Sequence, residues 1–175
     1  MGELKDIIPH AEKRLASIMS TTAVKILLID RKNGLLLHYL ANGDVKSHPL
    51  ASGLAGMIAK TGKHECVPNA YSHECFNGQV DLDTTMPLII WPVKDACEET
   101  EVIGIIEIVH VKGIEGLSTT NKAKLTTHDI ETVEFFSKQF SRMVMNKLSN
   151  SKSNNEGGTI ESSIHEEYHP ITLKH

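Results

Sequence analysis

The chain has 175 residues, 40% of them hydrophobic, and a formal net charge of −4, which fits one globular domain with a core of its own. Its isoelectric point near 6.2 argues against a nucleic-acid or anionic-membrane partner, since either needs clustered Lys and Arg. No run approaches the roughly 18 apolar residues that span a bilayer. The odd set Cys66, Cys75 and Cys97, without an apolar export signal, favours reduced thiols in the cytoplasm, with a cytoskeletal or ciliary assembly as one setting.

The first predicted element is a helix over residues 9–20. Proline suits the first turn of a helix and breaks its interior, so Pro9 is placed at the start and residues 1–8 become an N-terminal extension. Two strands follow at residues 23–29 and 35–40. The "NG" between them is a strong turn signal and predicts a hairpin.

The middle of the chain predicts one more short helix and two strands. "SGLAGMIAKTG", residues 52–62, has helical spacing and ends on a glycine. Residues 69–85 break every periodicity and predict a long ordered loop. Strands are predicted at residues 86–93 and 101–111. Because no crossover helix joins consecutive strands, we expect a largely antiparallel sheet in an α+β sandwich.

A long helix is predicted from Thr126 to Leu148, because Thr126 and Asp129 have the spacing of a capping box. Phe135 and Met145 fall on the side of this helix opposite to its apolar stripe. We expect them to contact a protein partner or a second copy of the chain through the terminal helices. The stripe expected to face the sheet consists of Ile130, Val133, Phe136, Phe140, Met143 and Val144.

The last segment, residues 149–175, is predicted to be a disordered polar tail. It opens with "SNSKSNNEGG", which cannot bury enough apolar surface to offset the entropy of ordering. The folded domain is therefore expected to span residues 9–148.

The triplet His-Glu-Cys occurs twice, at residues 64–66 and 73–75. In each triplet the His and the Cys are two residues apart, so each pair could chelate one side of a zinc ion. Structural zinc sites usually separate their ligands by two to four residues, and the intervening "VPNAYS" has no glycine knuckle. We therefore predict polar loop residues, a semi-buried thiol and no metal.

Glu107 interrupts the apolar strand "VIGIIEIVHV" on the face that it shares with Ile105 and Val109. A carboxyl group in that place must be exposed, paired or bound to a polar ligand. A position near a solvent-open end of the sheet and a ligand-binding role both stay open. His110, on the other face, is expected to be a satisfied or surface histidine.

The segment "GLAGMIAKTGKHECVPNAYSHECFNGQVDLDTT…WPVKDACEETEVIGIIEIVHVKG…LTTHDIE" resembles a GAF domain. It is most similar to those in the regulatory halves of cyclic nucleotide phosphodiesterases and related adenylate cyclases. The resemblance implies a central, largely antiparallel sheet with the N- and C-terminal helices on one face and a loop-rich ligand pocket on the other. The matching positions are Gly53, Gly56, Gly62, Ala70, Tyr71, Phe76, Asn77, Val80, Asp81, Thr84, Pro92, Val93, Ile103, Gly104 and Asp129.

The resemblance also implies which residues would form the pocket. In members that bind cyclic nucleotides, the ligand is held by backbone near a "GIAG" turn, by an Asp and a Thr of the next loop, and by an acidic strand residue. These positions correspond to Leu54 and Ala55, to Asp81 and Thr84, and to Glu107.

The sequence departs from the family signature for cyclic-nucleotide binding. Where the family has Asn-Lys, this chain has His110 and Val111, and Leu125 and Ile130 replace a Phe and a Glu. Each lost polar partner costs a ligand about 1–3 kcal/mol. We therefore expect a pocket degenerate for cyclic nucleotides, no cofactor, and a non-catalytic module for protein interaction or dimerisation.

Two alternatives stay open. One is a sensor of cGMP, cAMP or another small molecule that signals to a partner protein. The other is a reductase of free methionine sulfoxide, since small GAF proteins with that activity keep cysteines in a "GxxCG" turn and a "HIACD" loop. In this chain the turn is "GLAG", residues 53–56, without a cysteine.

Overall fold

The computed structural model describes residues 3–110 and 125–156. Within them, six strands form one sheet in the order β3-β2-β1-β6-β5-β4, and every neighbouring pair is antiparallel. This confirms the antiparallel sheet predicted from the sequence. The strands are β1 (Val24–Asp30), β2 (Leu35–Tyr39), β3 (Val45–Pro49), β4 (Glu65–Val67), β5 (Leu88–Lys94) and β6 (Val102–Val109).

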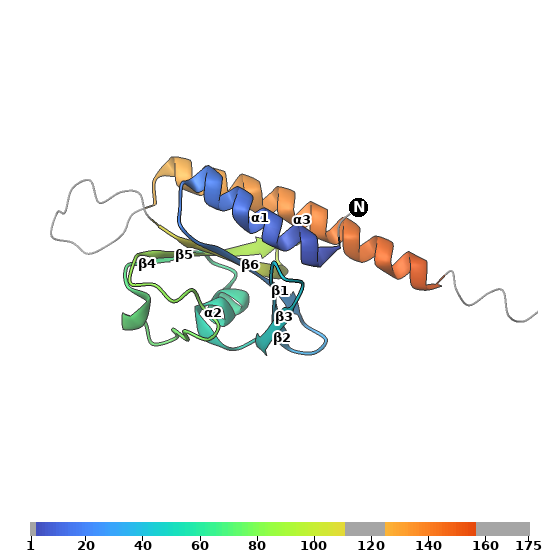
Figure 1. Ribbon diagram of the computed structural model, residues 1–175, viewed down its shortest axis with the longest axis horizontal. Coiled ribbons are helices and arrows are strands. Elements are labelled where there is room, and N and C mark those ends of the chain that lie inside the picture. Colours follow the sequence, from blue (N-terminus) through green and yellow to red (C-terminus); the bar gives the residue numbers. More distant parts are fainter. Residues whose placement is uncertain (1–2, 111–124, 157–175) are drawn as a thin grey trace, which may run out of the picture.

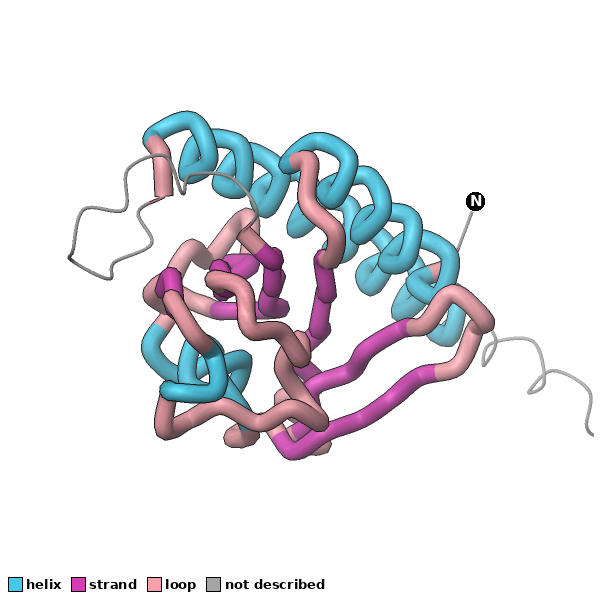
Figure 2. Tube along the Cα trace, turned by 60° about the vertical axis from the view of Figure 1, so that its left-hand side comes forward, coloured by secondary structure: helices cyan, strands magenta, loops and turns pink. Residues whose placement is uncertain are grey.

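Helices cover the sheet on both sides. The two long helices, α1 (Leu4–Met19) and α3 (Thr127–Glu156), run side by side over one face, and α2 (Gly53–Thr61) lies on the other (Figure 1). Figure 2 shows the same division, with the long loop that contains the 3-10 turn η1 (Ala70–Ser72) on the α2 side, away from the two long helices. The arrangement of terminal helices on one face and loops on the other is therefore the one expected.

Alternation along the strands produces two cores. Ile26 on β1 and Ile106 on β6 face the terminal helices, while Leu27 and Ile105, one residue away on each strand, face α2. All four side chains are fully buried. Burial of a side chain of this size contributes about 1.5–3 kcal/mol, so both layers hold the sheet in place.

Helix α1 begins at Leu4, not at Pro9, which corrects the predicted N-terminal extension. The Asp6 side chain accepts the backbone N–H of Glu3 at 3.1 Å, which caps the helix one turn before the proline. Ile8 is fully buried against the sheet. Packing of this turn therefore outweighs the backbone hydrogen bond that Pro9 cannot donate.

Helix α3 begins with the predicted capping box, because the Thr126 hydroxyl accepts the N–H of Asp129 at 3.1 Å. It continues past the predicted end at Leu148 to Glu156. The added residues include no Gly or Pro, and the first helix breaker, Gly157, follows the last helical residue. Residues 157–175 of the predicted tail lie outside the described residues.

Strand β3 was not predicted. Its sequence, "VKSHP", has no apolar alternation, and most of its residues are exposed because it forms an edge of the sheet. It nevertheless pairs with β2 over five positions, from Leu35 opposite Pro49 to Tyr39 opposite Val45.

Candidate functional site

Two acidic side chains, Asp81 and Glu107, lie on the α2 side of the sheet. Glu107 occupies the middle of β6, between Lys25 on β1 and Ile90 on β5. Its side chain is 0% exposed, and Asp81 is 2% exposed. The interpretation of Glu107 as a residue at a solvent-open end of the sheet is therefore wrong, and the carboxyl group must find its partners inside the protein.

Asp81 binds the first turn of α2. Its carboxyl group accepts the backbone N–H groups of Leu54 at 2.9 Å, Ala55 at 3.1 Å and Asn77 at 2.9 Å. The N–H groups of a first helical turn have no acceptor within the helix, and the helix dipole favours a negative group beside them. Asp81 thus supplies from the following loop the cap that the N-cap residue Ser52 does not supply with its own side chain.

Gly53 makes this contact possible. Its φ of +74° lies in the left-handed region, and a Cβ atom there would be 2.6 Å from Oδ1 of Asp81. Any other residue would be strained in its backbone and would collide with the carboxyl group. The first glycine of the "GLAG" turn therefore leaves the space that the Asp81 carboxyl group occupies.

Glu107 is only partly satisfied. Oε2 accepts the N–H of Leu82 at 2.7 Å, whereas Oε1 is buried without a hydrogen-bond partner among the described residues. Burial, followed by the charge and hydrogen-bonding capacity of Asp81, raises the pKa of Glu107 well above its ordinary value. Lys25 and the Leu82 N–H act in the opposite direction. Glu107 therefore keeps its proton at pH values where an exposed glutamate has lost it.

Lys25 and His48 complete the surroundings of the two acids. Lys25 is the cross-strand neighbour of Glu107, and its Nζ donates to the carbonyl of Val80, next to Asp81. His48 on β3 is partly buried, and this burial, together with the charge of Lys25, lowers the pKa of its imidazole. Lys25 is thus the basic side chain that lies next to both acids.

Of the five predicted pocket positions, the structure brings together Leu54, Ala55, Asp81 and Glu107. Thr84 is separate: its half-buried hydroxyl accepts the N–H of Met86 at 3.0 Å and shapes the turn before β5. Sequence reasoning missed Lys25, although its place two residues before the buried Leu27 would have put it on this face.

The cysteines of the two His-Glu-Cys triplets lie on different sides of the sheet. Cys66 packs against the cluster under the terminal helices, whereas Cys75 packs against the cluster on the α2 side. His64 stacks on Trp91 with ring centroids 4.3 Å apart, and His73 accepts the Cys75 N–H at 3.1 Å. Across the described ranges, no three His, Cys, Asp or Glu side chains are placed to share a metal ion. Glu65 and His73 approach each other to 3.7 Å, but among the described residues no third ligand joins this pair.

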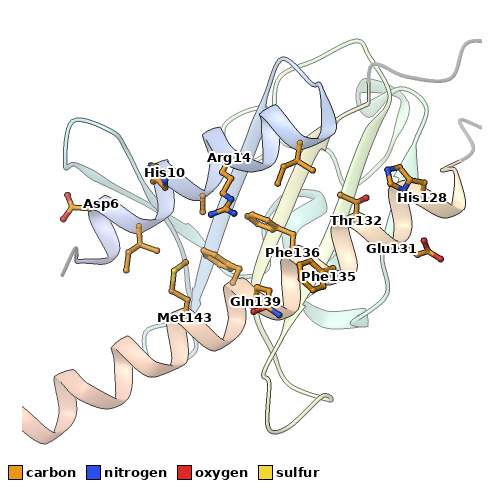
Figure 3. Close-up of a pocket in the computed structure, with 14 residues that line it drawn as sticks. Asp6, His10, Arg14, His128, Glu131, Thr132, Phe135, Phe136, Gln139 and Met143 are labelled. Carbon is orange, nitrogen blue, oxygen red and sulfur yellow. The ribbon is translucent and has the colours of Figure 1, made fainter.

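A second candidate surface lies between α1 and α3, on their outer side (Figure 3). This terminal-helix groove has a volume of about 880 Å³. Three apolar side chains in it are exposed: Phe135 by 68%, Ile18 by 50% and Met143 by 39%. The lining residues are Asp6, Ile7, His10, Ala11, Arg14, Ile18, His128, Glu131, Thr132, Phe135, Phe136, Gln139, Phe140 and Met143.

The groove contains one of the two side chains predicted to form a contact surface. Phe135 lines it, whereas Met145 is half-buried and does not line it. Met143, predicted to face the sheet, lines the groove instead. Phe135, Gln139 and Met143 follow one another at intervals of four residues and so share one side of α3.

None of the helices in residues 3–110 and 125–156 is long and apolar enough to cross a membrane.

No family model matches the sequence, but solved structures match the fold. The GAF domain of an Acinetobacter phosphoenolpyruvate-protein phosphotransferase has a TM-score of 0.64 at 15% identity, covering 85% of this chain and 86% of that chain. A free methionine-R-sulfoxide reductase from Neisseria meningitidis, solved with its substrate, has a TM-score of 0.60 at 12% identity, with 85% and 81% covered. A GAF domain/HD domain protein from Geobacter sulfurreducens has a TM-score of 0.60 at 9% identity, with 83% and 94% covered. The chain therefore has the GAF fold.

Proposed function

We propose that this chain is a non-catalytic regulatory module that associates with a second copy of itself, or with another protein, through the terminal-helix groove. The observation that carries the proposal is the exposed apolar surface of the groove, above all Phe135 at 68%. Burying an apolar side chain of this size contributes about 1.5–3 kcal/mol. A few such residues at the centre of an interface dominate its binding energy.

The contacts on the α2 side of the sheet support a function other than cyclic-nucleotide binding. The resemblance to regulatory GAF domains of phosphodiesterases assigns ligand contacts to the backbone at Leu54 and Ala55, and both N–H groups already donate to Asp81. An anionic ligand would have to displace a carboxyl group that is buried and bound three times. We therefore infer that the pocket is degenerate for cyclic nucleotides.

The cysteines support a non-catalytic role. One structural neighbour is a reductase of free methionine sulfoxide, and a thiol that reduces a sulfoxide must ionise readily. In this chain, burial raises the pKa of Cys66 to about 11, and the thiol packs on the helix side of the sheet. Cys66, Cys75 and Cys97 are all free thiols, which suits the cytoplasmic setting that we infer.

The association is tested with Phe135→Glu combined with Met143→Glu. Sedimentation of the full chain over a wide concentration range should show dimers for the natural sequence and monomers for the variant, because two charges would enter an apolar contact. Thr127→Glu, which adds a charge at an exposed position of the same helix that does not line the groove, should leave dimers intact. Circular dichroism should show the same fold in all three chains.

Two results would change the proposal. A chain that is monomeric at every concentration would exclude the second copy and leave a different protein as the occupant. That protein should then bind the natural chain and the Thr127→Glu variant but not the double variant in mild affinity purification. Equal binding to all three chains would contradict a role for the groove.

A small-molecule sensor is the second candidate, and one observation favours it. Oε1 of Glu107 is fully buried with no hydrogen-bond partner in the described part of the chain, as an atom reserved for a ligand would be. If cGMP or cAMP is that ligand, a hundredfold excess over its Kd adds about 2.7 kcal/mol to stability, which raises the melting temperature measurably. We expect no rise with either nucleotide. A rise that Asp81→Ala and Glu107→Ala both abolish would favour the sensor.

A further inference from the structure

Two carboxyl groups connect the loop before β5 to helix α2 and to strand β6. Asp81 accepts N–H groups from Leu54 and Ala55 on α2 and from Asn77 at the start of the loop segment 77–82. Glu107, on β6, accepts the N–H of Leu82 at the end of that segment. Helix, loop and sheet therefore meet through the side chains of these two residues.

If Asp81 and Glu107 are both ionised, one of their oxygen atoms lacks a hydrogen-bond donor. Glu107 Oε1 is then a buried acceptor without a donor in the described structure, and such an atom carries its full desolvation cost. A proton on Oε1 converts it into a donor, and the acceptor is the Asp81 carboxyl group, whose charge and hydrogen bonding act on Glu107. Two neighbouring buried carboxyl groups also repel each other when both are charged.

We propose that Asp81 and Glu107 share one proton and form a latch, which holds residues 77–82 against the first turn of α2 and opens when the proton is lost. The latch is independent of the terminal-helix groove, which lies on the opposite face of the sheet. Opening of the latch, and with it exposure of the backbone groups on the α2 side of the sheet, would then depend on pH.

The charges around the pair agree with a single shared proton. Lys25 approaches from β1, and the charges of Lys25 and Asp81 both act on His48 of β3. The lowered pKa of His48 keeps its imidazole neutral near pH 7, and the first turn of α2 has no acidic residue. One negative charge on the pair is therefore balanced by Lys25, the cation that lowers the pKa of Glu107.

The direction of the pH effect follows from the raised pKa of Glu107. In the unfolded chain a glutamate loses its proton near its ordinary value, about 4.3. Between that value and the higher pKa of the folded state, the folded chain binds one more proton, so stability falls as pH rises. The stabilisation by the latch is complete below the unfolded pKa and is lost as pH rises through the folded pKa.

The test compares the full natural chain with Glu107→Gln, whose amide keeps an acceptor for the Leu82 N–H and a donor for Asp81 but cannot ionise. Hydrogen exchange of the Leu54, Ala55 and Leu82 amides is followed from pH 5 to pH 10 and expressed as protection factors. Protection should fall by up to about tenfold per pH unit in the natural chain and stay constant in the variant. The control Glu74→Gln, an equal change at an exposed glutamate, should behave like the natural chain.

Constant protection in the natural chain, or a fall that persists in Glu107→Gln, would overturn the latch. A second measurement needs no variant: the side-chain carboxyl carbon of Glu107 should titrate in ¹³C NMR above the ordinary range. Titration near about 4.3 would contradict the shared proton. Neither experiment depends on whether the chain dimerises, so failure of the latch leaves the association through the groove untouched.

Discussion

The two sides of the sheet differ in which groups they leave exposed. On the α2 side, Asp81 and Glu107 are buried, and the backbone donors at Leu54, Ala55 and Leu82 are bound to them. On the helix side, the groove between α1 and α3 leaves aromatic and aliphatic side chains open, with Phe135 more exposed than buried. A face whose polar groups bind one another holds a fold together, whereas an open apolar surface gains free energy only when something covers it.

The difference makes a general point about assigning function to a fold. A GAF fold is compatible with ligand binding, catalysis and interaction, and the fold alone does not choose among them. In this chain we choose among these functions by asking which polar groups already have hydrogen-bond partners. Substitutions on the α2 side should therefore change stability, and substitutions in the groove should change association. Three of the following four predictions test this contrast, and the His64 prediction tests the stacked histidine of the first His-Glu-Cys triplet.

The largest expected effect is that of Gly53→Ala. The substitution imposes backbone strain at a φ of +74° and places a Cβ atom 2.6 Å from Asp81 Oδ1, so the carboxyl group must leave its donors. Strain of about 1–2 kcal/mol and a lost charged hydrogen bond of about 1.5–3 kcal/mol together predict a loss of about 2.5–5 kcal/mol. Chemical denaturation measures it.

Gly34→Ala is the matched control for this prediction. Gly34 has a similar φ of +67°, but an added Cβ there would meet no atom within 4 Å. Only the backbone strain of about 1–2 kcal/mol should be lost. Equal losses in both variants would show that the contact with Asp81 contributes nothing.

Asp81→Ala should have the next largest effect, a loss of about 2–4 kcal/mol, because three backbone N–H groups lose a common acceptor. The dimer should be unaffected at concentrations where the variant is folded. A variant that folds with natural stability would mean that water satisfies these donors, and the α2 side would then be open like the groove.

Local patterns in the sequence predicted most of the elements. The hairpin at Asn33 and Gly34, the glycine that ends α2 at residue 62 and the capping box at Thr126 each depend on residues close in the chain. Glu107 was also identified correctly as unusual, because one carboxyl group in an apolar strand breaks a two-residue period.

The partners of Glu107 and Asp81 could not be predicted from such patterns. Asp81 lies 27 residues after Leu54, and Glu107 lies 25 residues after Leu82, so these contacts depend on tertiary placement of the loop. The family resemblance named four of these residues but assigned them to a ligand rather than to one another. Strand β3 was missed for a related reason, since pairing with β2, and not its own composition, makes it a strand.

His64→Ala should have a smaller effect. His64 is exposed but stacks on Trp91, the only tryptophan, and a pair of rings of this kind contributes about 0.5–1.5 kcal/mol. We expect a loss of about 0.5–1 kcal/mol together with a change in tryptophan fluorescence. Metal analysis should find well below one zinc per chain with or without the substitution. Stoichiometric zinc that disappears in the variant would show that the His-Glu-Cys repeat binds metal after all.

The smallest effect on stability should come from Phe135→Ala. This side chain is 68% exposed, so the folded monomer loses little by its removal, and the free energy of unfolding at low concentration should change by less than about 0.5 kcal/mol. Phe140→Ala is the contrast on the same helix: Phe140 is 2% exposed, and its removal should cost about 3–5 kcal/mol. Association should respond in the reverse order, because Phe135 can contribute its buried area only in the complex, and its truncation should weaken the dimer by about 1.5–3 kcal/mol. A Phe135→Ala chain that is destabilised as a monomer yet dimerises normally would place this residue in the core, and the contrast between a satisfied face and an open one would not hold.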